Sequence, residues 1–365
     1  MVARLLWVVA VVVSLSSSVS ATRPAALDEI HVVGPYVSGN LTVYLVRGPN
    51  LLGDKKYLTL SEGLEQKKVI VYEKQQVNEL SVENLSDQDL YLQAGEIVKG
   101  GQQDRTLGRD MVVSAHSGQV PIGANCVEHG RWTQRGSESQ SQFAASPNAL
   151  ASKELKQANY SGDQQGVWDK VSKAQEKLAA NAPSLADAGG TLSQSPTSLE
   201  LTVEDKAVAS AAEAYEKGVA KNSQAFPDVI GFVFAINGKL NSGDVYASDE
   251  LFGKMYPKLL HAAAVEALAE REPNSDQKVF DAPKPEAVEA MIKAVDIAKG
   301  EPQPMDAIGM EQQINQEAQM PQQPAARPVA DRAVILKKQT NEVEMYETRD
   351  TETKAPFLHR AYLTK

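Results

Sequence analysis

Apolar and polar residues alternate along the first third of the chain in a way that predicts short β-strands. Runs of β-branched and aromatic residues, such as IHVVGPYV, LTVYLVRG and KKVIVYEK, are bounded by Gly, Pro and Asn. In ELSVENLS, Leu80 and Val82 fall on one side and Ser81 and Glu83 on the other, which is the period of two of a half-buried strand. We find no βαβ spacing here. Residues 28–135 are therefore predicted to form a mostly antiparallel β-sandwich or barrel.

The pattern changes to a helical period further along the chain. Residues 136–200 begin with a small, polar stretch, RGSESQSQFAASPNALASKE, which predicts a loop. After it, Trp168, Val171, Ala174 and Leu178 lie on one helical stripe. We interpret this stripe as a face packed against the core rather than as part of a ligand site.

Three later segments also have helical spacing. They are SLELTVEDKAVASAAEAYEKGV, then ELFGKMYPKLLHAAAVEALAER, in which Pro257 predicts a kink or a restart, and PEAVEAMIKAVDIAKG, which opens with Pro285. Between the first two, Asn237-Gly238 is flanked by apolar runs, a signal for a type I′ hairpin. Residues 160–300 are therefore predicted to form several packed amphipathic helices and one hairpin.

These patterns together predict one α+β domain over residues 28–300, followed by an appended tail. Within the domain, residues 180–198 have low complexity and are predicted to be an insertion. Residues 301–332 are rich in Pro, Gln and Met, which is typical of a linker without a packed core. Residues 333–365 hold three short C-terminal strand candidates. The pattern leaves open whether these strands join the N-terminal sheet or form a small separate ribbon.

The first residues have the pattern of an export signal. Arg4 precedes an apolar run over residues 5–13, and small residues lead up to Ala21. This order predicts a cleavable secretory signal peptide over residues 1–21. The run is shorter than the ~20 apolar residues that a membrane-spanning helix needs. An uncleaved N-terminal anchor is the alternative. We expect a secreted or periplasmic protein with no membrane contact beyond its export signal.

Composition and charge narrow the class of partner. The chain has 365 residues, of which 42% are hydrophobic and 23% are charged, as is ordinary for a globular protein. Its formal net charge is -10, which argues against nucleic acid and anionic membrane surfaces as partners because both attract basic patches. A single cysteine cannot form an internal disulfide, so an exported chain of this kind depends on its hydrophobic core.

The segment CVEHGRW, Cys126–Trp132, gathers residue types that bind metals or act as nucleophiles. Thiolate, carboxylate and imidazole groups are all zinc ligands. On a strand, however, Cys126 and Glu128 would point to one face and His129 to the other. No second CxxC or HxxxH accompanies them. We therefore expect neither a metal site nor a Cys–His nucleophile, and we interpret Cys126 as a small buried hydrophobe.

A second polar segment, GEIVKGGQQDR, lies upstream. Asp104 beside Arg105 predicts a structural ion pair more than an anion clamp, and Arg131 beside Trp132 predicts cation–π packing at a strand end. Neither GxxxxGK[ST] nor a helix-opening GxGxxG is present, so we expect no cofactor. The candidate polar site comprises Glu96, Gln103, Asp104, Arg105, Cys126, Glu128, Arg131 and Trp132.

Three segments in this order resemble a known family. They are VENLSDQDLYLQAGEIVKGGQQDR, then VPIGANCVEHGRW, then GFVFAINGK with the following FGKMYPKLLHAAAVEA. Together they resemble the ARG and Rhodanese-Phosphatase-superfamily-associated protein domain, in which ARG denotes ADP-ribosylglycohydrolase, over roughly Asp28 to Leu268. The resemblance implies an association with ADP-ribose-processing and phosphatase-like proteins, but no established function and no catalytic role for any residue. The matching positions are Gly95, Glu96, Gln103, Arg105, Cys126, Glu128, Gly130, Arg131 and Trp132.

Two functions are compatible with these residues. In the first, an exported, non-catalytic binding or scaffold protein uses the motif residues as a polar network that fixes the sheet, and its partner is an unknown small molecule or protein. In the second, a hydrolase or sensor holds a phosphorylated or ADP-ribose-like ligand through Arg105 and Arg131, with Glu96, Asp104 or Glu128 as general base. We favour the first because GxSxG and HExxH are absent. The second requires these side chains to converge on one solvent-reachable pocket.

Overall fold

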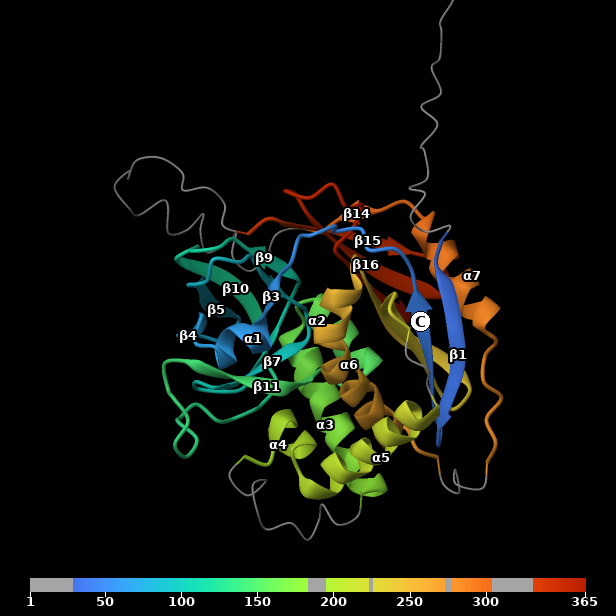
Figure 1. Ribbon diagram of the computed structural model, residues 1–365. Coiled ribbons are helices and arrows are strands. Elements are labelled where there is room, and N and C mark those ends of the chain that lie inside the picture. Colours follow the sequence, from blue (N-terminus) through green and yellow to red (C-terminus); the bar gives the residue numbers. More distant parts are fainter. Residues whose placement is uncertain (1–28, 183–194, 223–225, 273–277, 304–330) are drawn as a thin grey trace, which may run out of the picture.

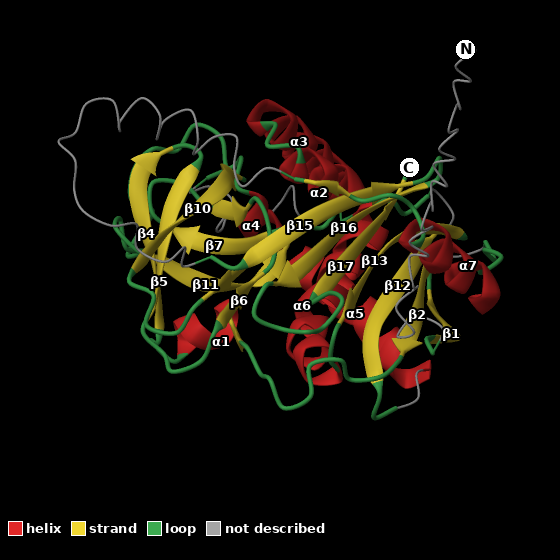
Figure 2. Ribbon diagram, turned by 90° about the horizontal axis from the view of Figure 1, so that it is seen from above, coloured by secondary structure: helices red, strands yellow, loops and turns green. Residues whose placement is uncertain are grey.

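The computed structural model describes residues 29–182, 195–222, 226–272, 278–303 and 331–365. The largest element is an antiparallel sheet of eight strands (Figures 1 and 2). In spatial order its strands are β1 (His31–Ser38), β2 (Leu41–Arg47), β12 (Val229–Ile236), β13 (Lys239–Tyr246), β17 (His359–Thr364), β16 (Val343–Asp350), β15 (Ala333–Gln339) and β14 (Glu301–Pro302).

A second β unit lies beside this sheet and has its own apolar core. Its antiparallel sheet of six strands has the order β11 (Phe143–Ala149), β7 (Glu96–Gly100), β8 (Arg105–Leu107), β10 (Gln119–Cys126), β5 (Glu79–Asn84) and β4 (Val69–Gln76). A small sheet of β3 (Leu58–Thr59), β6 (Leu90–Leu92) and β9 (Met111–Val113) completes the unit. Only the β3–β6 pair among these described strands is parallel. Leu80, Val71 and Ile122 are among the buried residues that these sheets enclose.

The helices of the described residues are α1 (Leu60–Glu65), α2 (Lys153–Tyr160), α3 (Gln164–Asn181), α4 (Leu199–Val203), α5 (Lys206–Asn222), α6 (Asp249–Ala269) and α7 (Pro285–Asp296). Helix α6 runs between the two β units and packs against β12, α5, α3 and β11 (Figure 1). Helix α7 covers the outer face of the large sheet, where Val288, Ile292 and Val295 join the core formed with Val32 and Tyr44.

Several local predictions are confirmed. Asn237 and Gly238 have φ of 52° and 77°, as a type I′ turn requires, and they join β12 to β13. Helix α6 starts behind Ser248, whose side chain accepts a hydrogen bond from the backbone N–H of Leu251, as predicted. It does not restart at Pro257, because Asp249–Ala269 is one helix with the proline inside it. The α+β class, with antiparallel sheets, packed helices and a hairpin in the second half, is likewise confirmed.

Other local predictions are wrong. The polar stretch expected as a loop contains β11 and leads into α2. Strand β11 forms because it pairs with β7 and buries Phe143 and Ala149 at its ends, so tertiary pairing outweighs a weak local signal. The helical segment over residues 199–222 is two helices, because α4 ends at Val203 and α5 begins at Lys206. Strand β10 ends at Cys126, so only the first residue of CVEHGRW is in a strand, and the residues after it form a loop.

The distant parts of the chain share one sheet. Strand β1 pairs with β2, and β2 pairs with β12 rather than with the other N-terminal strands, while β17, β16 and β15 continue the same sheet beyond β13. The predicted signal peptide over residues 1–21, and most of residues 180–198 and 301–332, lie outside the described residues. Among the described helices, none has the length and apolar character that a membrane span would need.

Candidate functional site

Asp104 is the centre of a buried network of charges behind β8. Its carboxylate accepts two hydrogen bonds from the Arg135 guanidinium, at 2.8 and 2.9 Å, and one from the hydroxyl of Ser198 at 3.0 Å. The backbone N–H of Gly100 adds a fourth at 3.1 Å. Asp104 is fully buried and Arg135 nearly so. The Asp104 carboxylate is therefore fully occupied by the protein itself.

Glu128 and Arg131 extend this network. Arg131 Nε donates to Glu128 Oε1 at 2.7 Å, and the backbone N–H of Asp104 donates to Glu128 Oε2 at 3.1 Å. The remaining Arg131 nitrogens donate to the backbone carbonyls of Gly100, Gly101 and Thr133. Burial favours the neutral carboxyl of Glu128, but its hydrogen bonds, that from Arg131 first, hold its pKa below the usual range. Arg131 thus connects its loop to the end of a strand, which is a structural role.

Arg105 points into the same region and is fully buried. Its Nη1 donates to the backbone carbonyl of Gln103 at 2.9 Å, and its Nη2 lies 3.6 Å from the Glu73 carboxylate. The Trp132 ring covers the guanidinium at 5.6 Å, which is the predicted kind of cation–π packing with a different arginine. Arg105 Nε and Nη2 have no hydrogen-bond partner within the described residues. The arginine is nevertheless enclosed by protein and has no open route to a ligand.

Cys126 lies at the end of β10 with its Sγ 3.5 Å from the carbonyl oxygen of Val77. It is fully buried, and burial raises the pKa of its thiol to about 11. His129 is exposed and its ring packs edge-to-face on Trp168, with the ring centroids 4.6 Å apart. A thiol of this kind is a poor nucleophile because it stays protonated at neutral pH. The cysteine and the histidine of CVEHGRW therefore lie in different environments, one buried and one exposed.

Glu96 stands apart from the other motif residues. One carboxylate oxygen accepts from Lys258 Nζ of α6 at 2.9 Å, and the other accepts from the backbone N–H of Gln93 at 2.9 Å. The Lys258 ammonium also donates to the Ser61 hydroxyl at 2.9 Å. The candidate residues therefore do not converge on one pocket: Asp104, Glu128 and Arg131 pair in the interior, whereas Glu96 reaches α6.

Lys258 lines a hollow that we call the α6 cleft. It lies where α6 meets the second β unit, with α4 and α5 nearby (Figure 1). Its volume is about 750 Å³, within the usual range for small-molecule sites. The cleft is lined by Ser61, Pro147, Asn148, Val203, Glu204, Ala209, Glu216, Lys254, Pro257, Lys258 and His261.

The basic groups of the α6 cleft lie on α6, and its acidic groups lie on other elements. Lys254, Lys258 and His261 project from one face of α6, whereas Glu204 follows α4 and Glu216 belongs to α5. Glu216 and His261 meet at 2.6 Å. Sequence reasoning missed this cleft, because charged residues on a helix are typical of a solvated face. Their spacing of four and three along α6, which places them on one face, was the available signal.

A buried carboxyl lies behind one wall of the cleft. Glu200 of α4 accepts hydrogen bonds from the Ser146 hydroxyl at 2.7 Å and from the side chain of Asn148 at 3.1 Å, and Asn148 lines the cleft. Its other oxygen has no hydrogen-bond partner within the described residues. Burial raises the pKa of Glu200 to about 7. This carboxyl therefore titrates near neutral pH without facing solvent.

A second chain of charged groups joins the two β units, and sequence reasoning missed it as well. His359 Nδ1 lies 2.7 Å from Asp110, and its Nε2 lies 3.0 Å from Asp244. Tyr91 and Thr348 donate their hydroxyls to Asp110. Burial favours the neutral imidazole, but the two carboxylates prevail and raise the pKa of His359 to about 9. The three residues are more than a hundred positions apart, so no local pattern could have revealed them.

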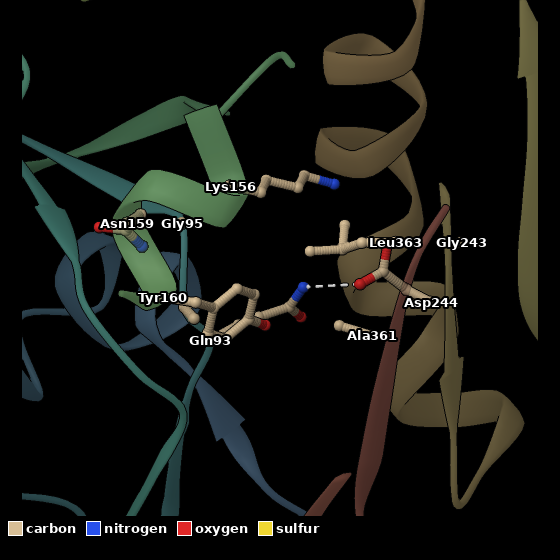
Figure 3. Close-up of a pocket in the computed structure, with 10 residues that line it drawn as sticks. Gln93, Gly95, Lys156, Asn159, Tyr160, Gly243, Asp244, Ala361 and Leu363 are labelled. Atoms are coloured by element: carbon tan, nitrogen blue, oxygen red, sulfur yellow. Dashed lines mark hydrogen bonds between the residues drawn. The ribbon is translucent and has the colours of Figure 1, made fainter. Parts of the chain in front are cut away.

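Beside Asp244 lies a small pocket (Figure 3). Gln93 donates to Asp244 Oδ1 at 3.3 Å across its floor, while Lys156, Asn159 and Tyr160 approach from α2 (Figure 3). The free volume is about 10 Å³, which is room for one water-sized molecule. The pocket is therefore too small for an organic ligand. Within the described residues, no group of three or more His, Cys, Asp or Glu side chains is placed to hold a metal ion.

The comparison with known families gives one match. The model of the ARG and Rhodanese-Phosphatase-superfamily-associated Protein domain matches residues 29–340. The match continues past Leu268, where the resemblance in the sequence ended, and it takes in α7 and β15. No curated protein and no solved structure matches the chain. Because the family model covers most of the chain, this protein belongs to the ARG and Rhodanese-Phosphatase-superfamily-associated Protein domain family.

Proposed function

We propose that this protein is an exported, non-catalytic binding protein that holds a small ligand in the α6 cleft. The observation that carries the proposal is the position of Lys258. Its ammonium is fixed by Glu96 and Ser61, which uses two of its three N–H donors, and the residue lines an open cleft of ligand size. A cation held in place by the protein costs little entropy to use in binding.

The other motif residues support a structural role within this proposal. Arg131 donates to Glu128 and to three backbone carbonyls, so a phosphate would have to replace bonds that already exist. Arg105 is enclosed beneath Trp132. A hydrolase or sensor that grips phosphate with these two arginines therefore has less support than a binding protein whose core they stabilise.

The cleft is tested by filling it. Ala209 lines the α6 cleft on α5, and Ser210 beside it is exposed. We suggest titrating the mature protein calorimetrically with a panel of amino acids, dicarboxylates, sugars and nucleotides, and repeating each positive result with Ala209→Trp and Ser210→Trp. We expect Ala209→Trp to weaken binding at least tenfold and Ser210→Trp to leave it unchanged. Equal binding by both variants would place the ligand elsewhere, and chemical conversion of a bound compound, seen by mass spectrometry, would contradict a non-catalytic function.

Export is tested on the N-terminus. Expression of the complete sequence in a secreting bacterial host, followed by fractionation and intact-mass measurement, should give a mature chain that begins at Thr22 outside the cytoplasm. Val11→Arg, which interrupts the apolar run, should keep the chain uncleaved and inside. An uncleaved wild-type chain in the cytoplasm would overturn this part of the proposal.

A further inference from the structure

We propose that the α6 cleft binds a zwitterion with an apolar body, which means a free amino acid with an apolar side chain or a short peptide made of such residues. This inference rests on the proposed function and names the class of ligand. It follows from three features of the cleft: a basic row on α6, acidic groups on other elements, and an apolar lining between them.

The basic row offers donors to a carboxylate. Lys254, Lys258 and His261 are one helical turn apart in succession, so their side chains lie side by side. The Lys254 ammonium is directed to the protein itself, because it donates to the Tyr57 carbonyl at 2.9 Å and lies 3.2 Å from Glu62, so the donors left for a ligand belong to Lys258 and His261. Lys258 has one N–H beyond its bonds to Ser61 and Glu96. His261 meets Glu216 through Nδ1, which leaves Nε2 for a ligand. A carboxylate can accept from two such donors at once, and bonds of this charge-assisted kind are the strong ones.

The acidic groups offer acceptors to an ammonium. The side chains of Glu204 and Glu216 keep 31% and 29% of their surface exposed. Glu204 pairs with Lys99, and Glu216 pairs with His261. A carboxylate has about four acceptor sites, so each can take a further N–H from a ligand. The same two groups repel phosphates and other multiply charged anions, and this disfavours nucleotides in the cleft.

The apolar lining sets the character of the ligand's body. Pro147, Val203, Ala209 and Pro257 supply hydrocarbon surface between the charged groups. Burying an apolar side chain there contributes the hydrophobic part of the binding free energy. The cleft has about 750 Å³, which accommodates a single amino acid or a few linked residues. Polar sugars would leave this surface without a complementary partner.

The test compares four ligands that differ in one group at a time. L-leucine, L-leucyl-L-leucine, N-acetyl-L-leucine and L-leucinamide are titrated into the mature protein by calorimetry. We expect leucine or dileucine to bind, and the difference between these two distinguishes a free amino acid from a peptide. Masking the amine or the carboxylate should weaken binding at least tenfold. If N-acetyl-leucine or leucinamide bound as tightly as leucine, the proposal of a zwitterionic ligand would be overturned.

Two variants assign the groups. Glu204→Gln should weaken the binding of leucine at least fivefold. It should leave the residual binding of N-acetyl-leucine, which has no ammonium group, unchanged. The double variant Glu96→Gln/Lys258→Met should weaken the binding of leucine to a similar extent and leave the residual binding of leucinamide unchanged. Glu96 is changed together with Lys258 because removing Lys258 alone leaves Glu96 buried without its cation, whereas the double variant keeps the charge balanced. Variants that affect all four ligands equally would contradict the assignment.

The failure of this inference is distinguishable from the failure of the proposed function. If none of the four compounds binds, but another compound binds and Ala209→Trp weakens its binding, the assignment of a zwitterionic ligand is wrong and the cleft remains the binding site. If the binding of leucine is unaffected by Ala209→Trp, by Glu204→Gln and by Glu96→Gln/Lys258→Met alike, the cleft is not the site and both proposals fall.

Discussion

Asp104 and Arg135 face each other in the interior through two parallel hydrogen bonds of 2.8 and 2.9 Å. This bidentate pair ties the residue that precedes β8 to a loop more than thirty residues later, and Ser198 at the start of α4 adds a third element. The motif residues that resemble a reaction centre in the sequence thus hold three segments of the chain together.

Asp104→Ala should be strongly destabilising. The change removes the bidentate carboxylate of the buried Arg135 and leaves it Glu138 at 3.0 Å and Glu128 at 3.6 Å, and the loss of one partner of a buried pair typically costs about 3–5 kcal/mol. The free energy of unfolding in urea measures this loss. Asp87→Ala is a matched control because Asp87 is fully exposed beside His116, and surface pairs contribute at most about 1 kcal/mol. Similar losses in the two variants would show that the network does not stabilise the fold.

Cys126 should be inert in the folded protein. The thiol is fully buried and burial raises its pKa to about 11, so at pH 8 the reactive thiolate is rare and shielded. We expect a thiol reagent such as DTNB to label the native protein at least a hundredfold more slowly than the protein in 6 M guanidinium chloride, where one thiol should react. Rapid native labelling would contradict the buried position and reopen a nucleophilic role.

His359 should make stability fall at alkaline pH. Its pKa is raised from 6.5 to about 9 in the folded state, so the protonated ring stabilises the fold fully below pH 6.5, and this contribution is lost as pH rises to about 9. The shift corresponds to about 3 kcal/mol. Unfolding measured between pH 6 and pH 10 should show this decline, and His359→Gln should lack it. A decline of equal size in His359→Gln would assign it to other groups.

Glu200 is an acid whereas His359 is a base, but its raised pKa also makes stability fall as pH rises. Burial raises the pKa of this acid from 4.5 to about 7, so the neutral carboxyl stabilises the fold fully below pH 4.5, and the contribution is lost as pH rises through 7. Glu200→Gln, which stays neutral, should therefore raise stability at pH 8 by about 1–3 kcal/mol and have little effect at pH 4.5. Glu213→Gln on the exposed surface of α5 is the control and should change neither value. Glu200→Gln that destabilises at pH 8 would show that the charge is tolerated there.

Period and turn chemistry in the sequence were sufficient for most elements and for the fold class. The Asn237-Gly238 turn, the strand over 41–47 and the start of helix α6 behind Ser248 each follow from a local rule. Strand β11 did not, since its residues become a strand only by pairing with β7. The location of Glu96 also needed the structure, because its partner Lys258 lies 162 positions later.

The same limit applies to the chemistry. A charged residue beside an aromatic one correctly suggested cation–π packing, but the ring of Trp132 covers Arg105 and not its neighbour Arg131. The rule of alternation, applied to CVEHGRW, presumed a strand that ends at Cys126. Side chains alternate between two faces only within the strand, so the contacts of the residues after its end depend on the path of the following loop.

The position of β17 has a consequence for biogenesis. This strand is hydrogen-bonded to β13 on one side and to β16 on the other, in the middle of the large sheet. Until it arrives, β13 and β16 each present an unpaired edge, the kind of surface that promotes aggregation. Such long-range pairing also slows folding. A nascent chain would therefore keep these two edges unpaired until the residues of β17 have emerged.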